Sequence, residues 1–466
     1  MARPIRKVLV ANRGEIALRI LRACRELGIE SVLAHSEADA KSLPVRLADR
    51  AVCIGGAAAA ASYLSKERVV GAAVAFGVDA IHPGYGFLAE NAGFAELCRE
   101  QDVAFIGPAP EVIRAMGDKI EARKFAAETG VPTIPGSGGG VADAAAARDI
   151  AETIGYPILV KAAAGGGGRG MRVIRARDEL ERGLNEAMGE AKAAFGDPSV
   201  YIEKFLTNIR HIEVQVLGDG SEVIHLGERD CSSQRRNQKL IEEAPCSAIS
   251  DGTRSALTAA ATAICQRVGY TSAGTIEFVY DNDEGKFYFI EMNTRIQVEH
   301  PVTEMTTGVD LVKEQIRIAD GQGLRLRQSD IRFSGHAIEC RINAEDPDRD
   351  FAPAPGLVTE YRPAGGPGIR VDSHLERGYV VPPFYDSLVA KLISWGNDRE
   401  EAIERMLRAL DETRIDGIKT TLGLQRMILE SRRFRSGDLN TQLVSELLAA
   451  NAQNRATTLV KAEAAQ

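Results

Sequence analysis

The chain has 466 residues, of which 44% are hydrophobic and 26% charged, and its formal net charge is −8. This length predicts about two or three domains, and the composition is ordinary for a soluble globular enzyme. The acidic balance argues against a large basic surface, so we expect no nucleic-acid partner. No apolar run reaches the ~20 residues that a membrane span needs, so we also expect no membrane partner.

The seven cysteines are scattered along the chain, and no two of them have CxxC spacing. This pattern argues against a disulfide framework or a zinc site and favours a reducing compartment. The first residues, MARPIRKVLVANRGE, lack the long apolar segment of a secretory signal. We therefore expect a cytoplasmic protein.

The first 110 residues alternate between strand and helix patterns. The apolar run KVLVA at 7–11 predicts a buried strand, and residues 14–28 follow with an apolar stripe at helical spacing. The segments SVLAHS, DAIHP and VAFIGP continue as strands with helices between them. Alternation of this kind predicts a parallel sheet.

The pattern changes near residue 111 and becomes mainly antiparallel. The expected helices cover 116–132, 142–155 and about 253–268, with a glycine-rich connector at 135–140. The expected strands are YPILVKA, MRVIRA, YIEKFL, RHIEVQVLG, EVIHLGERDC, AGTIEFVY (273–280) and KFYFIEMN (286–293). Residues 330–446 are predicted to form a third, mixed segment, and the polar tail 447–466 is expected to be loosely ordered.

A glycine-rich loop contains Gly165-x-Gly167-x-x-Gly170, which formally matches the dinucleotide fingerprint. That fingerprint requires a following helix, whereas MRVIRA predicts a strand, so the dinucleotide interpretation fails. No Walker A motif occurs in the chain. A hairpin tip with Lys161 before it and Arg169 inside it can hold phosphate and close over a ligand. A plain flexible hairpin is the alternative.

The stretch EMNTRIQVE at 291–299 alternates polar and mainly apolar residues. Its polar residues are Glu291, Asn293, Arg295, Gln297 and Glu299. Because successive side chains of a strand point to opposite faces, an extended chain would place all of them on one face. An ordinary strand with one wet face is the simple alternative.

A neighbouring hairpin favours a metal site at the start of this stretch. The turn DNDEG at 281–285 joins the two strands, and a hairpin centred near residue 284 places Glu277 opposite Glu291. Like charges directly opposite each other are destabilising, so a cation between them is expected. Two carboxylates and Asn293 are hard oxygen ligands suited to Mg²⁺ beside the phosphates of a nucleotide triphosphate.

Arg295, Gln297 and Glu299 lie further along the same predicted face. A cation, an amide and a carboxylate at this place suit an anion that attacks the γ-phosphate, with Glu299 as the base.

Five motifs in order, IHPGYGFLAEN, GGGGRGM, ERDCSSQRRNQK, EMNTRIQVEHPVTEM and ECRINAEDP, closely resemble the biotin carboxylase component of biotin-dependent carboxylases. This is an ATP-grasp family, and the resemblance covers about residues 4–446. It implies an α/β fold. The implied parts are a Rossmann-like N-terminal domain (1–110), a central ATP-grasp domain (111–325) with a mobile lid (about 131–204), a mixed α+β C-terminal domain (326–446) and a flexible tail (447–466).

The resemblance also implies the reaction. ATP and bicarbonate would give carboxyphosphate, which would carboxylate biotin on a separate carrier protein, with Mg²⁺ or Mn²⁺ required. The implied partners are a biotin carboxyl carrier protein, carboxyltransferase subunits and a second copy of the chain. The expected final acceptor is acetyl-CoA, as in fatty acid biosynthesis, with propionyl-CoA, another acyl-CoA or pyruvate as alternatives that the sequence does not separate.

The resemblance implies a role for each of a set of residues. ATP contacts fall on Lys119, Lys161, Gly167, Gly168, Glu203, Lys204, Phe205, Leu206, His211, Gln234, Asn237, Glu277 and Glu291. Metal binding falls on Glu277, Glu291 and Asn293. Bicarbonate contacts fall on Lys239, Arg295, Gln297, Val298 and Glu299. Biotin contacts fall on Tyr85 and Arg341. The implied catalytic residues are Arg295, Glu299, Lys239 and Arg341.

Within this set, Glu299 resembles the base that deprotonates bicarbonate, and Arg341 resembles the group that stabilises the biotin enolate. Glu339 and Arg341 share a predicted strand face, which also fits a plain surface ion pair. Two positions depart from the family pattern: Asn237 stands where many relatives have histidine, and Ala164 where some have glycine.

Two other functions remain open on the residues alone. Another ATP-grasp ligase would join a carboxylate to an amine through an acyl phosphate, and its ATP cleavage would depend on an amine. A nucleotide-binding regulatory module would show no turnover. No Met-Lys-Met sequence, the usual site of biotin attachment in this family's carriers, occurs in the chain, so we expect biotin on a separate protein.

Overall fold

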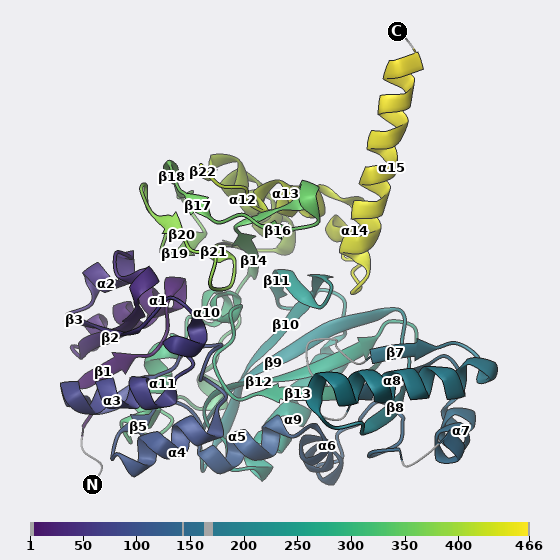
Figure 1. Cartoon of the computed structure of the whole chain (residues 1–466), viewed down its shortest axis with the longest axis horizontal. Coiled ribbons are helices and arrows are strands. Elements are labelled where there is room, and N and C mark those ends of the chain that lie inside the picture. The colour runs from purple at the N-terminus through teal and green to yellow at the C-terminus, as the bar shows by residue number, and fades with distance from the viewer. Residues whose placement is uncertain (1–3, 142–143, 163–170, 465–466) are drawn as a thin grey trace.

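The computed structural model describes residues 4–141, 144–162 and 171–464. Three parts are visible along the colour gradient: a purple N-terminal layer, a blue-to-teal central part and a green C-terminal part (Figure 1). Within the described ranges, no helix combines the length and the apolar character that a membrane crossing requires.

The N-terminal part is a parallel sheet of order β3-β2-β1-β4-β5, as the alternating pattern predicted. Its strands are β1 (Lys7–Val10), β2 (Glu30–Ser36), β3 (Arg50–Gly55), β4 (Ala80–His82) and β5 (Ala104–Phe105). Its helices are α1 (Gly14–Glu26), α2 (Leu43–Leu47), α3 (Lys66–Phe76) and α4 (Ala92–Glu100), with short 3₁₀ turns η1 (Glu37–Asp39) and η2 (Ala59–Ala61). Helices on both faces bury the central strands, which explains why residues 8–10 of β1 are continuously apolar.

The helix predicted at 116–132 is wrong in its bounds. The chain instead forms α5 (Pro110–Gly117) and α6 (Lys119–Glu128). Asp118 separates them, because its carboxylate accepts hydrogen bonds from the backbone N–H groups of Ile120 and Glu121 at 2.9 and 3.1 Å. Aspartate is a preferred N-cap residue, so it begins a new helix here.

A small antiparallel sheet of order β7-β6-β8 follows. It contains β6 (Ile158–Ala162), β7 (Met171–Ile174) and β8 (Val200–Lys204), with α7 (Ala144–Ile154), η3 (Arg177–Glu179) and α8 (Leu180–Phe195). Figure 1 shows α8 lying along this sheet. The residue run after the glycine loop is a strand, β7, which confirms that the loop is not a dinucleotide fingerprint.

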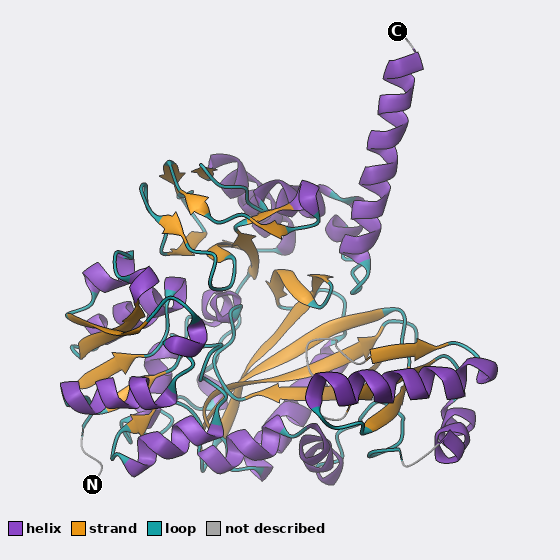
Figure 2. Ribbon diagram, in the orientation of Figure 1, coloured by secondary structure: helices purple, strands orange, loops and turns teal. Residues whose placement is uncertain are grey.

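One antiparallel sheet of order β13-β12-β9-β10-β11-β14-β21-β19 runs through the centre of the molecule (Figure 2). Its strands are β9 (Ile209–Asp219), β10 (Val223–Arg235), β11 (Gln238–Ala244), β12 (Thr271–Asp281), β13 (Lys286–Asn293), β14 (His336–Asn343), β19 (Ile369–Ser373) and β21 (Leu388–Gly396). The helices α9 (Asp251–Arg267), α10 (His300–Thr307) and α11 (Leu311–Ala319) belong to the same central region. The pairing of β11 with β14 carries this sheet from the central part into the C-terminal part.

The C-terminal part adds short strands and helices around β14 and β21. The short strands are β15 (Glu345–Asp346), β16 (Ala352–Pro353), β17 (Gly356–Leu357), β18 (Glu360–Arg362), β20 (Val380–Val381) and β22 (Arg414–Asp416). The helices are η4 (Gln328–Asp330), η5 (Pro347–Arg349), α12 (Arg399–Glu412), α13 (Leu422–Glu430), α14 (Arg432–Arg435) and α15 (Leu443–Ala464).

Helix α15 runs through most of the tail 447–466 and projects from the body (Figure 1), and the loose order expected for this tail stays a prediction. Alanine-rich sequence with few β-branched residues has high helix propensity, which explains the helix.

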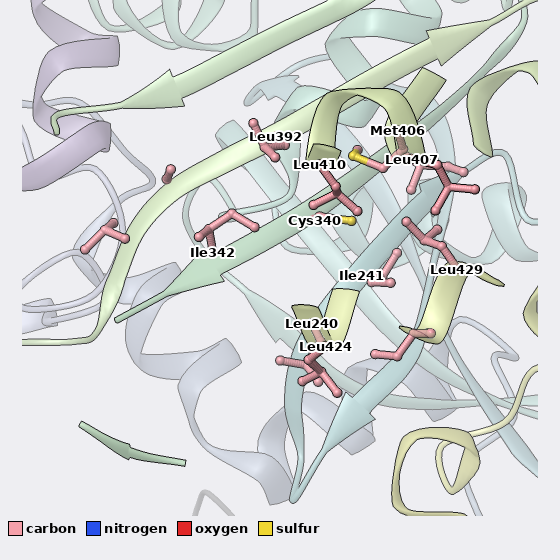
Figure 3. Close-up of a cluster of buried hydrophobic side chains, with 14 of the residues drawn as sticks. Leu240, Ile241, Cys340, Ile342, Leu392, Met406, Leu407, Leu410, Leu424 and Leu429 are labelled. Carbon is pink, nitrogen blue, oxygen red and sulfur yellow. The ribbon is translucent and has the colours of Figure 1, made fainter. Parts of the chain in front are cut away.

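A buried apolar cluster fixes which way β14 faces. Cys340 and Ile342 of β14 pack with Leu392 of β21 and with α12 and α13 (Figure 3). Because side chains alternate along a strand, Glu339 and Arg341 point to the opposite face, away from this core. That opposite face is covered by α10, and it carries the charged groups described below.

Candidate active site

A cavity of about 560 Å³ lies where the N-terminal layer meets the central sheet. The start of α1, the turn at 85–87, β11, β12, β13 and β14 all contribute side chains to its wall. The predicted site residues that line it are Tyr85, His211, Asn237, Lys239, Glu277, Glu291, Asn293, Arg295, Gln297, Val298 and Arg341. Residues far apart in the sequence are thus brought to one space.

The predicted metal hairpin has the expected register. Glu277 and Glu291 are direct Cα partners across β12 and β13, with a bulge immediately after Glu277. Asn293 donates from Nδ2 to Glu277 Oε1 at 3.0 Å. The carboxylate oxygens and the amide oxygen are the hard donors that Mg²⁺ prefers, so the residues present fit that ion.

The two carboxylates of this pair differ in pKa. Burial raises the pKa of Glu277, but Lys239 and His211 outweigh burial and hold it well below its usual range. Burial, together with the nearby charge of Glu277, raises the pKa of Glu291. One carboxylate is therefore firmly ionised, and the other gains most from an added cation.

Lys239 lies at the centre of the charged cluster. Its ammonium donates to Glu213 at 2.6 Å, Glu277 at 2.9 Å and Glu299 at 2.7 Å. His211, Glu213 and Glu277, and likewise Glu213, Cys231 and Glu299, present ligand atoms within 4.8 Å of one another. The ammonium already neutralises the carboxylates of both groups, so we assign Glu213 and Glu299 to the lysine, and of these residues only Glu277 also belongs to the predicted metal pair.

The stretch 294–299 is not a strand, which corrects the extended conformation predicted for it. Strand β13 ends at Asn293, a loop follows, and α10 begins at His300 with Pro301 in its first turn. The backbone N–H of Thr294 donates to Glu90 at 3.0 Å instead of to a neighbouring strand. The loop still brings Arg295, Gln297 and Val298 to the cavity wall.

Glu90 and Lys391, to which the sequence assigned no role, hold the loop that carries Arg295, Gln297 and Val298. Arg295 donates from Nε to Glu90 at 2.8 Å and from Nη1 to Gln297 Oε1 at 3.0 Å. The fully buried Lys391 donates to the backbone oxygen of Val298 at 2.7 Å. Glu90 belongs to the motif IHPGYGFLAEN and could have been suspected there, whereas no local signal marked Lys391.

Glu299 lies at the N-terminus of α10 and is fully buried. It accepts from Lys239 at 2.7 Å and from Arg341 Nη2 at 2.9 Å. Burial alone would raise the pKa of Glu299, but Lys239 and Arg341 hold it well below its usual range. The carboxylate is therefore ionised in this arrangement.

Arg341 is only partly exposed and lines the cavity, so the interpretation of a surface ion pair is wrong. Its Nε donates to Glu242 Oε1 at 2.5 Å, and Glu339 beside it is fully buried. Tyr85, the other residue assigned to biotin, donates its hydroxyl hydrogen to Glu15. Glu15 in turn lies 3.2 Å from the ammonium of Lys391.

A second group of predicted nucleotide residues gathers on the small sheet and its exit. Lys161 donates to Glu203 at 2.5 Å, and Arg123 pairs with the same carboxylate. Lys204 lies 3.2 Å from Glu284, and the backbone N–H of Phe205 donates to Pro157. These side chains are not in the wall of the large cavity.

The other residues predicted to contact ATP lie on several different elements. Leu206 packs against a small apolar cluster with Ile134, and Gln234 is buried on β10 opposite Lys239. Lys119 is the first residue of α6. Asn237 has a φ of 64°, a left-handed conformation that asparagine tolerates well. Gly167 and Gly168 lie outside the described residues.

The fold and the cavity together define an ATP-grasp ligase, with a parallel α/β layer, a small sheet bearing Lys161 and a large sheet bearing the carboxylate pair. Three family models match the chain: "Biotin carboxylase, N-terminal domain" at 4–113, "Carbamoyl-phosphate synthase L chain, ATP binding domain" at 118–327 and "Biotin carboxylase C-terminal domain" at 339–446.

Curated relatives and a solved structure match this chain over nearly its whole length. A biotin carboxylase from Nostoc sp. is 57% identical over 95% of this chain and 99% of its own length. One of the subunits of pyruvate carboxylase from Methanothermobacter thermautotrophicus is 56% identical over 94% of this chain and 89% of its own length. The biotin carboxylase domain dimer of Hydrogenobacter thermophilus 2-oxoglutarate carboxylase, solved with MgADP, ADP and bicarbonate, has a TM-score of 0.91 and 51% identity, covering 96% of this chain and 99% of its own.

The chain belongs to the biotin carboxylase family. The resemblance seen in the five sequence motifs and the predicted fold class are both confirmed.

Proposed function

We propose that this chain uses ATP and bicarbonate to carboxylate biotin on a separate carrier protein, as the first half-reaction of an acyl-CoA carboxylase. The single observation that supports this most is the position of Glu299. It lies within hydrogen-bond distance of Lys239, which contacts the metal pair, and of Arg341, which lines the same cavity. Through these hydrogen bonds, Glu299 is linked both to the carboxylates proposed to bind the metal and to the arginine proposed to bind biotin.

The metal ligands in this proposal are Glu277, Glu291 and Asn293. A bound Mg²⁺ would neutralise charge on the β- and γ-phosphates of ATP. Lys161 and Lys204 on the small sheet contribute further positive charge toward the nucleotide, and we infer that the segment of about 131–204 acts as the lid. His211, Gln234, Asn237 and Leu206 complete the proposed nucleotide contacts.

Bicarbonate is proposed to bind between Arg295, Gln297 and the backbone of Val298. In that position Arg295 and Lys239 orient the anion, and Glu299 removes its proton so that its oxygen attacks the γ-phosphorus. The product is carboxyphosphate, with ADP leaving. Arg341 then donates hydrogen bonds to the ureido oxygen of biotin and stabilises the enolate that forms when N1 loses its proton. The bond between the carboxyl carbon and the phosphate oxygen of carboxyphosphate breaks, the released phosphate takes the N1 proton, and N1 forms a bond to the carboxyl carbon.

Relatives support the cofactors and partners of this proposal. The Hydrogenobacter structure contains MgADP and bicarbonate and is a dimer, so we propose the same ligands and a homodimer for this chain. Acetyl-CoA is the proposed final acceptor. The relatives also include pyruvate and 2-oxoglutarate carboxylases, so the acceptor must be tested with separate carboxyltransferases.

The experiment that tests the function measures ADP release by the purified chain. We expect ATP cleavage to require bicarbonate and Mg²⁺ and to rise when free biotin is added. A rate indifferent to bicarbonate, once contaminating ATPases are excluded, would contradict the proposal. Stimulation by an amine in place of biotin would favour the carboxylate–amine ligase instead.

A further inference from the structure

Another pair of like-charged residues, besides Glu277 with Glu291 and Glu277 with Glu213, lies on the face of the central sheet that carries Arg341. Glu242 of β11 and Glu339 of β14 are direct Cα partners, just as Glu277 and Glu291 are on β12 and β13. Both are fully buried. Two carboxylates in this arrangement repel each other unless a cation or a proton neutralises one of them.

No metal-like donor set accompanies this pair within the described residues. Glu242 Oε1 accepts from Arg341 Nε at 2.5 Å, whereas Glu242 Oε2 and both oxygens of Glu339 have no hydrogen-bond partner there. Other buried carboxylates near the cavity each have a cation within 3.2 Å: Glu15 has Lys391, Glu213 has Arg229 and Lys239, Glu277 has Lys239, and Glu299 has Lys239 and Arg341. In the part of the chain that the structure describes, Glu339 forms no such ion pair.

We propose that Glu339 carries a proton, that Glu242 is ionised, and that Glu242 is the positioning residue that orients Arg341 toward biotin. This inference rests on the proposed function of the cavity. Arg341 is held at its Nε edge by Glu242 and reaches Glu299 through Nη2 at 2.9 Å. With its Nε edge fixed, the guanidinium can turn its Nη edge from Glu299 to the ureido oxygen of biotin without losing its buried counter-charge.

The ionisation behaviour of the two carboxylates agrees with this assignment. Burial, with Glu242 and Glu299 nearby, raises the pKa of Glu339 well above its usual range despite Lys391. Burial raises the pKa of Glu242 to about 7, and Arg341 limits that rise. The titratable and charged groups that face the pair are Arg341, Glu299, Lys239, Lys391, Cys231 and Tyr85.

The test compares E242Q and E339Q with a matched control, E243Q. Glu243 is the next residue of β11, is equally buried and pairs with Arg399 at 2.7 Å, but it faces away from the cavity. Each variant is assayed for bicarbonate-dependent ATP cleavage without biotin and for carboxylation of free biotin. The wild-type chain is assayed first, because its failure in both assays would contradict the proposed function and not this inference.

We expect E242Q to lose on the order of 10²-fold in kcat for biotin carboxylation, the usual cost of misplacing a catalytic group. Its biotin-independent ATP cleavage and its KM for ATP should stay within about twofold of wild type. E339Q should match wild type in both assays, because glutamine is isosteric with a protonated glutamic acid. E243Q should be less stable but keep the wild-type ratio of the two activities.

Three outcomes would overturn the proposal. Equal loss of both activities in E242Q would show that Glu242 only supports the fold. A loss in E339Q as large as in E242Q would show that Glu339 is the ionised partner. Wild-type carboxylation by E242Q would show that Arg341 is oriented without it.

The pH profile gives a readout that a structural role would not move. Glu242 becomes protonated as pH falls below about 7, so kcat for biotin carboxylation by the wild type should fall there while biotin-independent ATP cleavage changes less. This acidic limb should be absent in E242Q. The same limb in E242Q would assign it to another group and overturn the role of Glu242.

Discussion

Two of the directly opposed glutamate pairs of the central sheet solve the same electrostatic problem differently. Glu277 and Glu291 have an amide, Asn293, and a lysine beside them, and they offer several oxygens to a metal ion. Glu242 and Glu339 have one arginine and, among the described residues, no comparable donor set. The same register of like charges therefore indicates a cation site in one place and, as we propose, a proton in the other. The residues next to each pair decide whether a cation or a proton neutralises it.

Glu299 lies between the two pairs and connects them. Lys239 joins it to Glu277, and Arg341 joins it to Glu242. Neutralising Glu299 should therefore produce the largest effect of any single change to this network, because it weakens both connections at once.

The first prediction is that Glu299→Gln loses about 10²–10⁴-fold in carboxylation, since an amide cannot accept the proton of bicarbonate. Nucleotide binding should persist, because the ion pairs of Glu299 are with Lys239 and Arg341, whereas Lys161 on the nucleotide side pairs with Glu203. Single-turnover carboxylation and ATP binding by calorimetry check the two halves. Near-normal carboxylation in this variant would falsify the role of Glu299 as the base.

The second prediction breaks the metal pair. Glu277→Gln or Glu291→Gln should weaken Mg²⁺ binding by at least the about 10–100-fold that loss of an outer-sphere partner typically costs. Each change removes one charge from the proposed metal site. Mg²⁺ titration of ATP cleavage measures the effect, with E339Q as the matched control from the other pair. If both variants keep the wild-type Mg²⁺ dependence, the hairpin is only structural.

The third prediction concerns stability and the proton of the second pair. Glu339 has a raised pKa in the folded state, so folding retains a proton that the unfolded chain releases above its ordinary pKa. This contribution to stability is present at low pH and is lost as pH rises toward the folded pKa, at up to ~1.4 kcal/mol per pH unit. E339Q removes that dependence.

Thermal unfolding of wild type and E339Q across pH 5 to about 9 tests this sign. The difference in Tm should move in favour of E339Q as pH rises. A constant difference at all pH values would mean that Glu339 is ionised in the folded chain, and the contrast between the two pairs would disappear.

The smallest expected effect concerns the small sheet. ATP should slow hydrogen exchange across the described parts of 131–204, because closure over the nucleotide orders the segment that carries Lys161 and Lys204. Exchange measured by mass spectrometry with and without nucleotide checks it. Equal exchange in both conditions would mean that this segment is static and not a lid.

The sequence could predict one pair and not the other, for a physical reason. A short turn fixes the register of an antiparallel hairpin, so residues 281–285 were enough to place Glu277 opposite Glu291. Glu242 and Glu339 meet only because β11 pairs with β14 across a long stretch of chain. No local pattern determines that pairing, so the second pair could be found only from the fold.

The alternation at 291–299 led to a wrong prediction of the backbone conformation after Asn293. Polar residues at every second position predicted an extended strand, but the strand ends at Asn293. Contacts of Thr294 and Arg295 with Glu90, and Pro301 in the first turn of α10, favour a loop and then a helix. The residue types still pointed to the cavity, because Glu291, Asn293, Arg295 and Gln297 line it.

The most direct test of the whole account is transfer of ¹⁴C from labelled bicarbonate to biotin on an added, purified carrier protein. The account predicts label on the carrier that depends on ATP, Mg²⁺ and this chain, and that is strongly reduced in Glu299→Gln. The labelled biotin should release its carboxyl group on mild acidification. ATP cleavage without any label on biotin, or label transferred equally well by Glu299→Gln, would contradict it.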